Sequence, residues 1–356
     1  MKILFLSKRR PQGKDLLTRP YGRFFYLPYC LAQRGHEVHI LLLSYKKEPA
    51  VKIEKDGMTW LSEGIYPWGP LKYIAKANTL VRTVKPDWIV GFSDTYYGIL
   101  AEQLGTKYGL KSVIDAYDNY ESYIPWFKLL HHYWRKAITH ATVVTAAGPH
   151  LGDYLNSFRR DKEVRIVPMA ADPEFVPLNK RECRQKLGLP LDKKLVGYCG
   201  AIYNNRGIDL LFKVFTLLKE NSNIEFVLSG RKEKKIRLPE QVKWLGYLPD
   251  EQVPVLLNGL DVLLVINKPS AFGHFSYPVK LYEAMRCQIP VVVADVEGSK
   301  WILKEHPQFL ARTGDPIDFA EKIQSVLALD GFDYGSQNSW GHSGDIFEIA
   351  LHYYHK

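Results

Sequence analysis

The chain has 356 residues, of which 46% are hydrophobic and 24% charged, as in ordinary globular proteins, and it is long enough for two domains. No apolar run approaches the ~18 residues that a membrane-spanning helix needs. The four cysteines are widely separated and form no Cys-x-x-Cys pair, which indicates neither a zinc site nor a disulfide framework. We expect a cytoplasmic protein, and the opening MKILFLSKRR predicts a first strand, not a signal peptide.

The net charge of +10 is concentrated in the N-terminal half of the chain. Residues 1–170 contain 25 Lys and Arg against 15 Asp and Glu, whereas residues 171–356 contain 23 of each. Such a distribution attracts an anionic partner, such as nucleic acid, a phosphorylated substrate or an acidic membrane surface. No helix-turn-helix, RNP or zinc-finger signature accompanies the charge, which argues against nucleic acid.

Short β-rich runs alternate with helix-length amphipathic segments, a pattern typical of parallel sheets with crossover helices. In the first half the expected strands are 2–7, 37–44, 87–92, 111–115 and 141–146. In the second half they are 194–200, 224–230, 242–246, 261–267 and 290–295. The sequence therefore predicts an α/β protein with two Rossmann-like, doubly wound domains that face a cleft.

The Pro-bearing segment 169–180 has neither strand nor helix periodicity, so we expect the domain hinge there. The predicted domains are residues 1–170 and 171–340. Residues 341–356 have apolar side chains at helical spacing after a Gly/Ser-rich stretch. They predict a final helix that could pack back on the first domain.

The loop after the first strand, residues 8–25, is strongly basic, and ligands of open α/β sheets collect at the carboxyl ends of strands. It contains Lys8, Arg9, Arg10, Lys14, Arg19 and Arg23, with Gly13 and Gly22 for close backbone approach. We interpret it as an anion-recognising acceptor loop with Gly22, Arg23 and Arg19 as contacts. A flexible, solvated loop is the alternative.

Residues 276–295 place a lysine in the first turn of a predicted helix, which Ser276 can cap and Pro278 can begin. Lys280 there costs from a few tenths to about 1 kcal/mol unless an anion binds the same helix terminus. Glu283, three residues on, shares its helix face. A cation for phosphate and a carboxylate for hydroxyls predict a nucleotide or nucleotide-sugar site; a solvated surface pair is the alternative.

Arg206-Gly207 precedes a long amphipathic helix that follows the strand 194–200. Arg206 thus repeats the placement of Lys280, and its planar guanidinium suits phosphate oxygens. Two such cations from separate β-α units indicate one diphosphate more strongly than either alone. Arg231, after the strand 224–230, is a third and weaker candidate.

The second half resembles the nucleotide-sugar-binding domain of GT-B glycosyltransferases, specifically the retaining group called family 4. The matching landmarks are Val167-Pro168 to Phe175-x-Pro177, Gly200 to Arg206-Gly207, residues 244–265 and residues 278–293. Weaker matches in the first half are the opening strand and residues 34–38 and 85–92. The resemblance implies sugar transfer from a nucleotide diphosphate, with retention and without a bound metal or other cofactor.

By this resemblance, Arg206 and Lys280 bind the donor diphosphate and Glu283 holds the ribose. The implied contacts to the base are Leu245, Gly246 and Tyr247, and those to the sugar are His274, Phe275 and Ser276. The chain departs from the family at Phe275, where many members have a second glutamate, and at Ala201, where an arginine is common.

The family often places a histidine near the reacting carbon, but the matching segment 113–123 contains none. Asp118 is the first substitute and Asp115 the second, to orient the acceptor hydroxyl or to accept its proton. An unshifted aspartate with a pKa near ~4 is a weak base, which favours positioning. Otherwise, Asp115 caps the turn after its strand and Asp118 is solvated.

The segment 124–140 interleaves aromatic and basic residues: Trp126, Phe127, Tyr133 and Trp134 with Lys128, Arg135 and Lys136. Either it docks on an acidic membrane or its aromatic side chains lie in the core.

We expect a UDP- or GDP-sugar-dependent hexosyltransferase with an anionic or lipid-linked glycan acceptor at the inner membrane face, as in the assembly of surface polysaccharide such as lipopolysaccharide. A nucleotide-sugar epimerase of the same fold and a noncatalytic sugar-nucleotide- or anionic-surface-binding protein stay open. The first strand lacks a following G-x-G-x-x-G, which excludes a Rossmann dehydrogenase.

Overall fold

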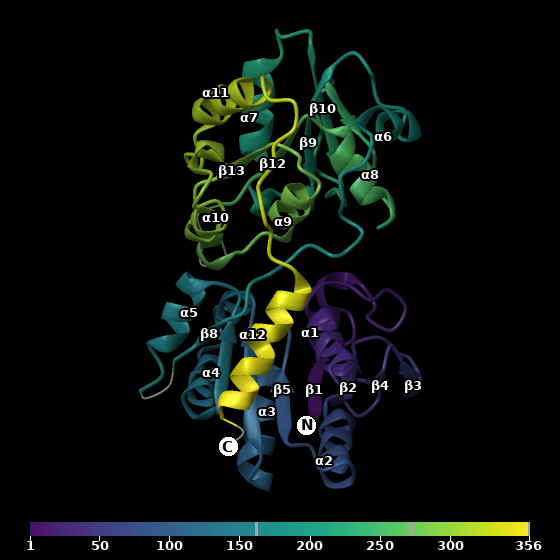
Figure 1. Cartoon of the computed structure of the whole chain (residues 1–356), viewed down its shortest axis with the longest axis vertical. Coiled ribbons are helices and arrows are strands. Elements are labelled where there is room, and N and C mark those ends of the chain that lie inside the picture. The colour runs from purple at the N-terminus through teal and green to yellow at the C-terminus, as the bar shows by residue number, and fades with distance from the viewer. Residues whose placement is uncertain (161–162, 269, 271–272, 355–356) are drawn as a thin grey trace. The chain divides into compact units, whose positions relative to one another are not determined.

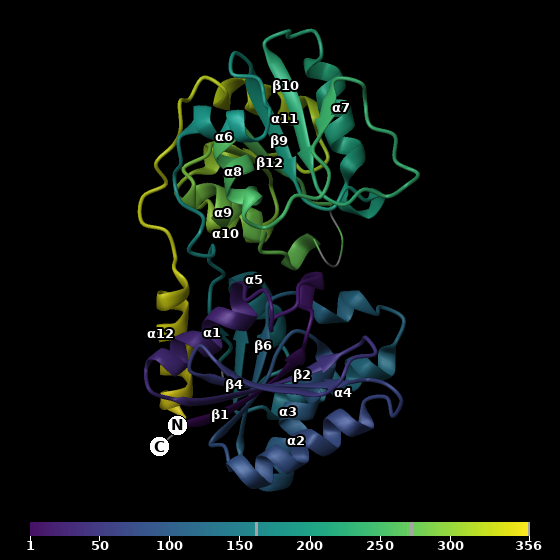
Figure 2. The ribbon, with the colours of Figure 1, turned by 90° about the vertical axis from the view of Figure 1, so that its right-hand side faces the viewer.

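The structure, a computed structural model, describes residues 1–160, 163–268, 270 and 273–354 (Figure 1). It divides into two compact units, the first made of Met1–Met169 with Asn338–Lys356 and the second of Ala170–Gln337. Each unit has one largely parallel sheet with helices on both faces (Figures 1 and 2). The predicted fold class, two Rossmann-like α/β domains, is confirmed.

The sheet of the first unit has eight strands in the order β3-β4-β2-β1-β5-β6-β7-β8. Their bounds are β1 Lys2–Lys8, β2 Glu37–Ser44, β3 Val51–Lys55, β4 Met58–Gly64, β5 Trp88–Gly91, β6 Lys111–Ala116, β7 Val143–Ala146 and β8 Arg165–Ile166. All neighbouring strands pair in parallel except β3 and β4. The carboxyl ends of β1, β5 and β6 therefore meet at one edge, where open sheets bind ligands.

The helices of the first unit cover the two faces of this sheet. They are α1 Gly22–Gln33, α2 Leu71–Val84, α3 Thr95–Tyr108, α4 Lys128–His140, α5 Pro149–Asn156 and α12 Trp340–Tyr353, with 3-10 turns η1 Pro11–Gly13 and η2 Tyr120–Tyr123. Alternate residues of β1 face opposite ways. Leu4 and Leu6 pack toward α2 and α3, and Phe5 between them faces Phe347 of α12, with ring centroids 6.4 Å apart.

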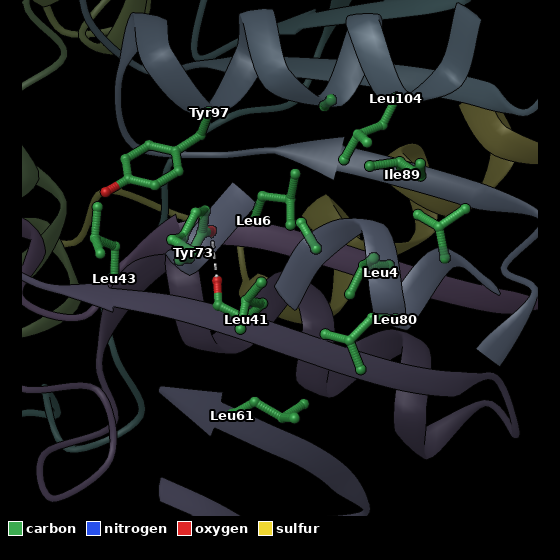
Figure 3. Packing of buried hydrophobic residues seen from close by; sticks show 13 residues of the cluster. Leu4, Leu6, Leu41, Leu43, Leu61, Tyr73, Leu80, Ile89, Tyr97 and Leu104 are labelled. Atoms are coloured by element: carbon green, nitrogen blue, oxygen red, sulfur yellow. Dashed lines mark hydrogen bonds between the residues drawn. The ribbon is translucent and has the colours of Figure 1, made fainter. Parts of the chain in front are cut away.

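The core between the sheet and the helices α2 and α3 is apolar and almost fully enclosed (Figure 3). Among the residues drawn, one hydrogen bond is marked: the hydroxyl of Tyr73 in α2 donates to the carbonyl oxygen of Leu41 at 2.9 Å. Each buried leucine contributes about 1.5–3 kcal/mol relative to an exposed one. This packing holds β1 and β5 in place, and with them the carboxyl edge of the sheet.

The helix α12 returns to the first unit and packs on α1, as the sequence predicts (Figure 1). The indole of Trp340 stacks on the ring of Tyr26, with centroids 5.8 Å apart. Gly344 allows the close approach, because a Cβ there would lie 2.6 Å from the Cβ of Cys30. The contact between the helices thus requires a glycine at this position.

The second unit has six parallel strands in the order β11-β10-β9-β12-β13-β14. The strands are β9 Lys194–Cys199, β10 Ile224–Ser229, β11 Val242–Trp244, β12 Val262–Val265, β13 Val291–Ala294 and β14 Leu310–Ala311. The helices are α6 Lys180–Lys186, α7 Ile208–Leu218, α8 Gln252–Gly259, α9 Val279–Arg286, α10 Glu297–Ile302 and α11 Pro316–Val326, with 3-10 turns η3 Asn204–Arg206, η4 Gly273–Phe275 and η5 Pro307–Phe309. The helices α7 and α11 lie on one face, and α6 and α8 on the other (Figure 1).

Candidate functional site

The first turn of α9 carries the predicted lysine. The helix begins at Val279 with Pro278 as its N-cap residue, so Ser276 precedes the helix and does not cap it. Nζ of Lys280 lies 2.5 Å from Oε2 of Glu283. Glu283 is buried, whereas the lysine side chain is one-third exposed. The two side chains therefore share one helix face, with the cation toward solvent.

The surroundings of Lys280 stabilise its charged form. Burial alone would lower the pKa of Lys280, but Glu283, Cys199 and Asp172 outweigh it and leave the pKa above its ordinary value. The ammonium also lies 5.8 Å from the centre of the Phe175 ring, within the range of a cation–π contact. Lys280 is therefore a permanently charged group at neutral pH.

Arg206 approaches the same strand end from a different β-α unit. It ends the turn η3, and Gly207, with a φ of 81°, then serves as the N-cap of α7. Burial raises the pKa of Tyr198 to about 12, and the nearby charge of Arg206 opposes that shift. Tyr198 and Cys199 are the last two residues of β9, so Arg206 and Lys280 each act near the carboxyl end of this strand.

The ends of β9 and β10 lie unusually close together. A Cβ on Gly230, whose φ is 142°, would lie 1.8 Å from the carbonyl oxygen of Gly200. The N–H of Gly230 donates to the carbonyl of Gly246 at 2.8 Å, which ties the loop after β11 to this edge. Only glycine fits at position 230, because the backbones after β9 and β10 are in direct contact.

The predicted base-binding residues lie in that loop. The N–H of Leu245 donates to the carbonyl of Leu228 at 2.9 Å, and Gly246 accepts two hydrogen bonds, so these groups serve the loop itself. The aromatic side chains beside them are open to solvent: Trp244 is 44% and Tyr247 50% exposed. The guanidinium of Arg231 covers the ring of Tyr247 at 4.8 Å. The parts of this loop that are open to a ligand are therefore the aromatic rings of Trp244 and Tyr247.

Close backbone contacts surround the predicted sugar-binding residues. A Cβ on Gly273 would lie 2.1 Å from the carbonyl oxygen of Lys268, and a Cβ on Gly298 the same distance from that of Ser276. His274 is exposed, and Phe275 and Ser276 are half-buried. The segment 273–276 is therefore fixed against α10 while its side chains stay within reach of solvent.

In the first unit, two predicted site residues form a buried ion pair with each other. The guanidinium of Arg23 donates to both oxygens of Asp115 at 2.7 and 2.6 Å, and a third N–H donates to the carbonyl of Val167. Both side chains are 0% exposed, and Thr145 donates to the same carboxylate. Both side chains are enclosed, so neither the predicted acceptor contact Arg23 nor the predicted catalytic Asp115 is open to a substrate in this arrangement.

Arginines of the basic loop pair with carboxylates of the first unit. Arg9 and Arg10 both pair with Asp15 and with Glu48, at distances from 2.5 to 3.1 Å. The hydrogen bond from Arg10 is the main reason why the pKa of Glu48 falls to about 2. Of the predicted acceptor contacts, Gly22 begins α1 at a φ of 58° and Arg19 is partly buried.

Asp118, the first catalytic candidate, is buried and hydrogen-bonded, not solvated as in the alternative interpretation. The hydroxyl of Tyr123 donates to its Oδ2 at 2.8 Å and lies 3.2 Å from the hydroxyl of Tyr117. Burial and the charge of Asp118 raise the pKa of both tyrosines, which stay protonated. Lys8, at the end of β1, lies 6.0 Å from the Tyr123 ring, so a cation and a carboxylate share this edge.

The aromatic residues around α4 divide between core and surface. Trp134 is 1% exposed, whereas Trp126, stacked on Phe127 at 5.7 Å, is 78% exposed. Arg135 pairs with the buried Glu121 through two 2.7 Å hydrogen bonds, and Lys128 and Lys136 are exposed. In the described part of the chain, no helix is long and apolar enough to cross a membrane.

Two family profiles match the chain in succession. The profile described as "Glycosyl transferase 4-like domain" matches residues 26–170, and "Glycosyl transferases group 1" matches residues 179–344. The putative teichuronic acid biosynthesis glycosyltransferase TuaC of Bacillus subtilis is 26% identical over 144 residues, 40% of this chain and 36% of TuaC. D-inositol 3-phosphate glycosyltransferase of Stackebrandtia nassauensis is 24% identical over 219 residues, 53% of this chain and 48% of that protein. These matches span between one third and one half of the relatives' own length.

Solved structures match almost the whole chain. Sucrose-phosphate synthase from Thermosynechococcus elongatus has a TM-score of 0.75 at 16% identity, over 99% of this chain and 94% of that one. Anabaena Alr3699/HepE in complex with UDP-glucose has a TM-score of 0.69 at 16% identity, over 99% and 95%. At such identities the likeness establishes the fold, and the two profiles establish the family. The chain belongs to the group 1 glycosyltransferases, related to family 4, and has their GT-B fold.

Proposed function

We propose that this protein transfers a hexose from a nucleotide diphosphate donor, by default a UDP-sugar, to a glycan acceptor, with retention of the anomeric configuration. The observation that carries the proposal is the pair of cations, Arg206 and Lys280, at the carboxyl end of β9. They come from different β-α units, and each lies near the carboxyl end of β9. The chain belongs to a glycosyltransferase family, and the diphosphate of a nucleotide-sugar donor is a ligand that suits such a pair of cations.

The donor diphosphate binds between these two cations in this proposal. Lys280 in the first turn of α9 opposes the helix dipole, and a phosphate there removes that cost. Glu283, buried beside it, accepts hydrogen bonds from the ribose hydroxyls once the phosphate competes for the lysine. Cations fixed on the departing diphosphate stabilise the charge that develops as the glycosidic bond breaks.

The base and the sugar occupy the loops on either side. The base lies against the loop Leu245, Gly246 and Tyr247, where the exposed rings of Trp244 and Tyr247 suit a planar partner. The transferred sugar lies along His274, Phe275 and Ser276. Uridine is the preferred base because a UDP-glucose complex is known for one structural neighbour, Anabaena HepE.

The acceptor binds at the carboxyl edge of the first sheet, near Arg19 and Gly22. Asp118 orients the attacking hydroxyl there, held by Tyr123, and the departing phosphate helps to remove the proton. A surface-polysaccharide acceptor is suggested by the name of the relative TuaC. Exposed Trp126 beside Lys128 supports a lipid-linked or otherwise anionic acceptor and a peripheral contact with acidic membrane.

The test is turnover of UDP- and GDP-sugars with free and lipid-linked glycan acceptors. Lys280→Ala and Arg206→Ala should each reduce kcat/KM about 10²–10³-fold, the usual loss for one transition-state charge contact. Lys304→Ala, at a 70% exposed side chain of the same unit, is the matched control and should leave it unchanged. Wild-type kinetics in both active-site variants, or release of an isomerised sugar nucleotide without acceptor, would refute the proposal.

A further inference from the structure

Three potential metal-binding side chains from opposite ends of the sequence meet on the first unit. His36 lies between α1 and β2, and Glu348 and His352 lie one turn apart on α12. One ligand atom from each lies within 4.8 Å of the others. We propose that these residues bind a divalent transition-metal ion, of which Zn²⁺ is representative, and that the ion fastens α12 to the first unit.

The geometry brings two imidazole nitrogens to one carboxylate oxygen. Nε2 of His36 lies 2.7 Å and Nε2 of His352 lies 3.5 Å from Oε1 of Glu348. The other carboxylate oxygen faces Arg34, whose Nε is 3.4 Å away. Nδ1 of His36 lies 3.2 Å from the amino group of Met1, on the far side of the ring. Arg34 thus fixes one carboxylate oxygen. Because Nδ1 accepts from the amino group, the ring proton of His36 lies on Nε2, and an ion that binds there displaces it.

The set of ligand atoms selects the kind of ion. Two imidazoles and one carboxylate suit Zn²⁺ and other late first-row metals, whereas Mg²⁺ and Ca²⁺ prefer oxygen ligands. Zinc bonds of about 2.0–2.2 Å from such ligands place neighbouring ligand atoms about 3.3–3.5 Å apart in a tetrahedron. The 3.5 Å between His352 and Glu348 already matches this spacing. The 2.7 Å between His36 and Glu348 needs to increase by less than 1 Å.

Burial is graded across the cluster in a way that suits binding from solution. The side chains of His36 and Glu348 are 10% and 19% exposed, and that of His352 is 55% exposed. A protein site with three ligands leaves the fourth position to water, which the exposed side can supply. The ion would replace a hydrogen bond between His36 and Glu348 by bonds that also recruit His352.

The site is separate from the proposed transfer reaction. His36 directly precedes Glu37, the first residue of β2, so it lies at the amino edge of a parallel sheet. Lys8 and Asp118 lie at or after the carboxyl ends of β1 and β6, the opposite edge. The expectation of metal-independent catalysis is therefore unaffected, and the ion contributes to stability alone.

The experiment is a titration of the chelator-treated, tag-free full chain with ZnCl₂, followed by calorimetry and thermal unfolding. One ion should bind per chain and raise the melting temperature in a saturable manner, as expected for a ligand of the folded state. His352→Ala should weaken binding at least about 100-fold, since even outer-shell changes cost 10–100-fold. Its melting temperature without metal should fall by little, because the 3.5 Å contact of His352 with Glu348 lies at the surface.

His342→Ala is the matched control, an exposed histidine at the start of the same helix. It should bind zinc as wild type does. Equal weakening in His342→Ala and His352→Ala, the absence of saturable binding, or an equal stabilisation by MgCl₂ would each overturn the proposal. Sugar transfer in excess chelator is measured in parallel, so a loss of the transferase proposal and a loss of the metal site are distinguishable.

Discussion

Replacing Asp115 by asparagine removes the negative charge from the buried pair with Arg23. The guanidinium then stays enclosed with no counter-charge, and one of the two 2.6–2.7 Å hydrogen bonds meets an amide N–H instead of an oxygen. Breaking a buried ion pair from one side costs about 3–5 kcal/mol. For a domain of 150–250 residues each kcal/mol lowers the melting temperature by about 2–4 °C, so Asp115→Asn should melt roughly 6–20 °C lower.

The assay is thermal and urea unfolding of the full chain, with donor turnover measured well below the melting temperature. Glu37→Gln is the control, because it breaks the Lys2–Glu37 pair, whose side chains are about half exposed. Such a surface pair contributes at most about 1 kcal/mol. Arg23→Met combined with Asp115→Leu should recover much of the loss, since an apolar replacement of a buried pair is often tolerated.

A different outcome would restore the catalytic interpretation of Asp115. If Asp115→Asn unfolds within the range of the Glu37→Gln control and yet loses turnover, the carboxylate acts on the substrate. A purely structural role of the buried Asp115 would then be refuted.

Two further variants test the carboxyl edge of the first sheet. Glu48→Gln should be less stable than wild type near pH 7 but should lose less between about pH 5 and pH 2. The reason is that the folded-state pKa of about 2 lies below the ordinary 4.5, so ionised Glu48 stabilises the fold above pH 4.5 and ceases to as the pH falls to 2. Urea unfolding of both proteins across this pH range measures the free energy of unfolding. Parallel pH dependences of that free energy in Glu48→Gln and wild type would contradict the prediction. Tyr123→Phe removes the 2.8 Å hydrogen bond to Asp118 and should lower kcat about 10-fold with the donor KM unchanged. A change in donor KM alone would count against a positioning role for Asp118.

The parallel strands and the Lys280–Glu283 pair could be predicted because their signals are local. A strand buried on both faces appears as a continuous apolar run, and a three-residue spacing on a helix fixes a shared face. The hairpin of β3 and β4 was missed, although its signal is present. Asp56 and Gly57, with φ of 57° and 75°, form the turn between two β-rich runs, the Asp-Gly pattern of a type I′ hairpin. The two-residue strands β8 and β14 are too short to have a pattern.

Several partners of charged residues could not be predicted, because they come from distant segments. Arg23 meets Asp115 across 92 positions, and His36 meets Glu348 across 312. Glu48, which follows β2, is the partner of Arg9 and Arg10 that their spacing in the sequence does not reveal. Glu348 and His352 do have the i, i+4 spacing of a metal pair, but a third ligand is recognisable only in the folded chain.

The return of α12 makes the second unit an insertion within the first. The polypeptide passes between the units twice, after Met169 and again before Asn338. Residues 170–337 are a continuous segment with its own sheet and core, which suits separate expression. The first unit cannot be obtained by cutting the chain once, because Phe347 would be lost from Phe5. The first unit can be produced alone by joining residue 169 to residue 338 through a short linker.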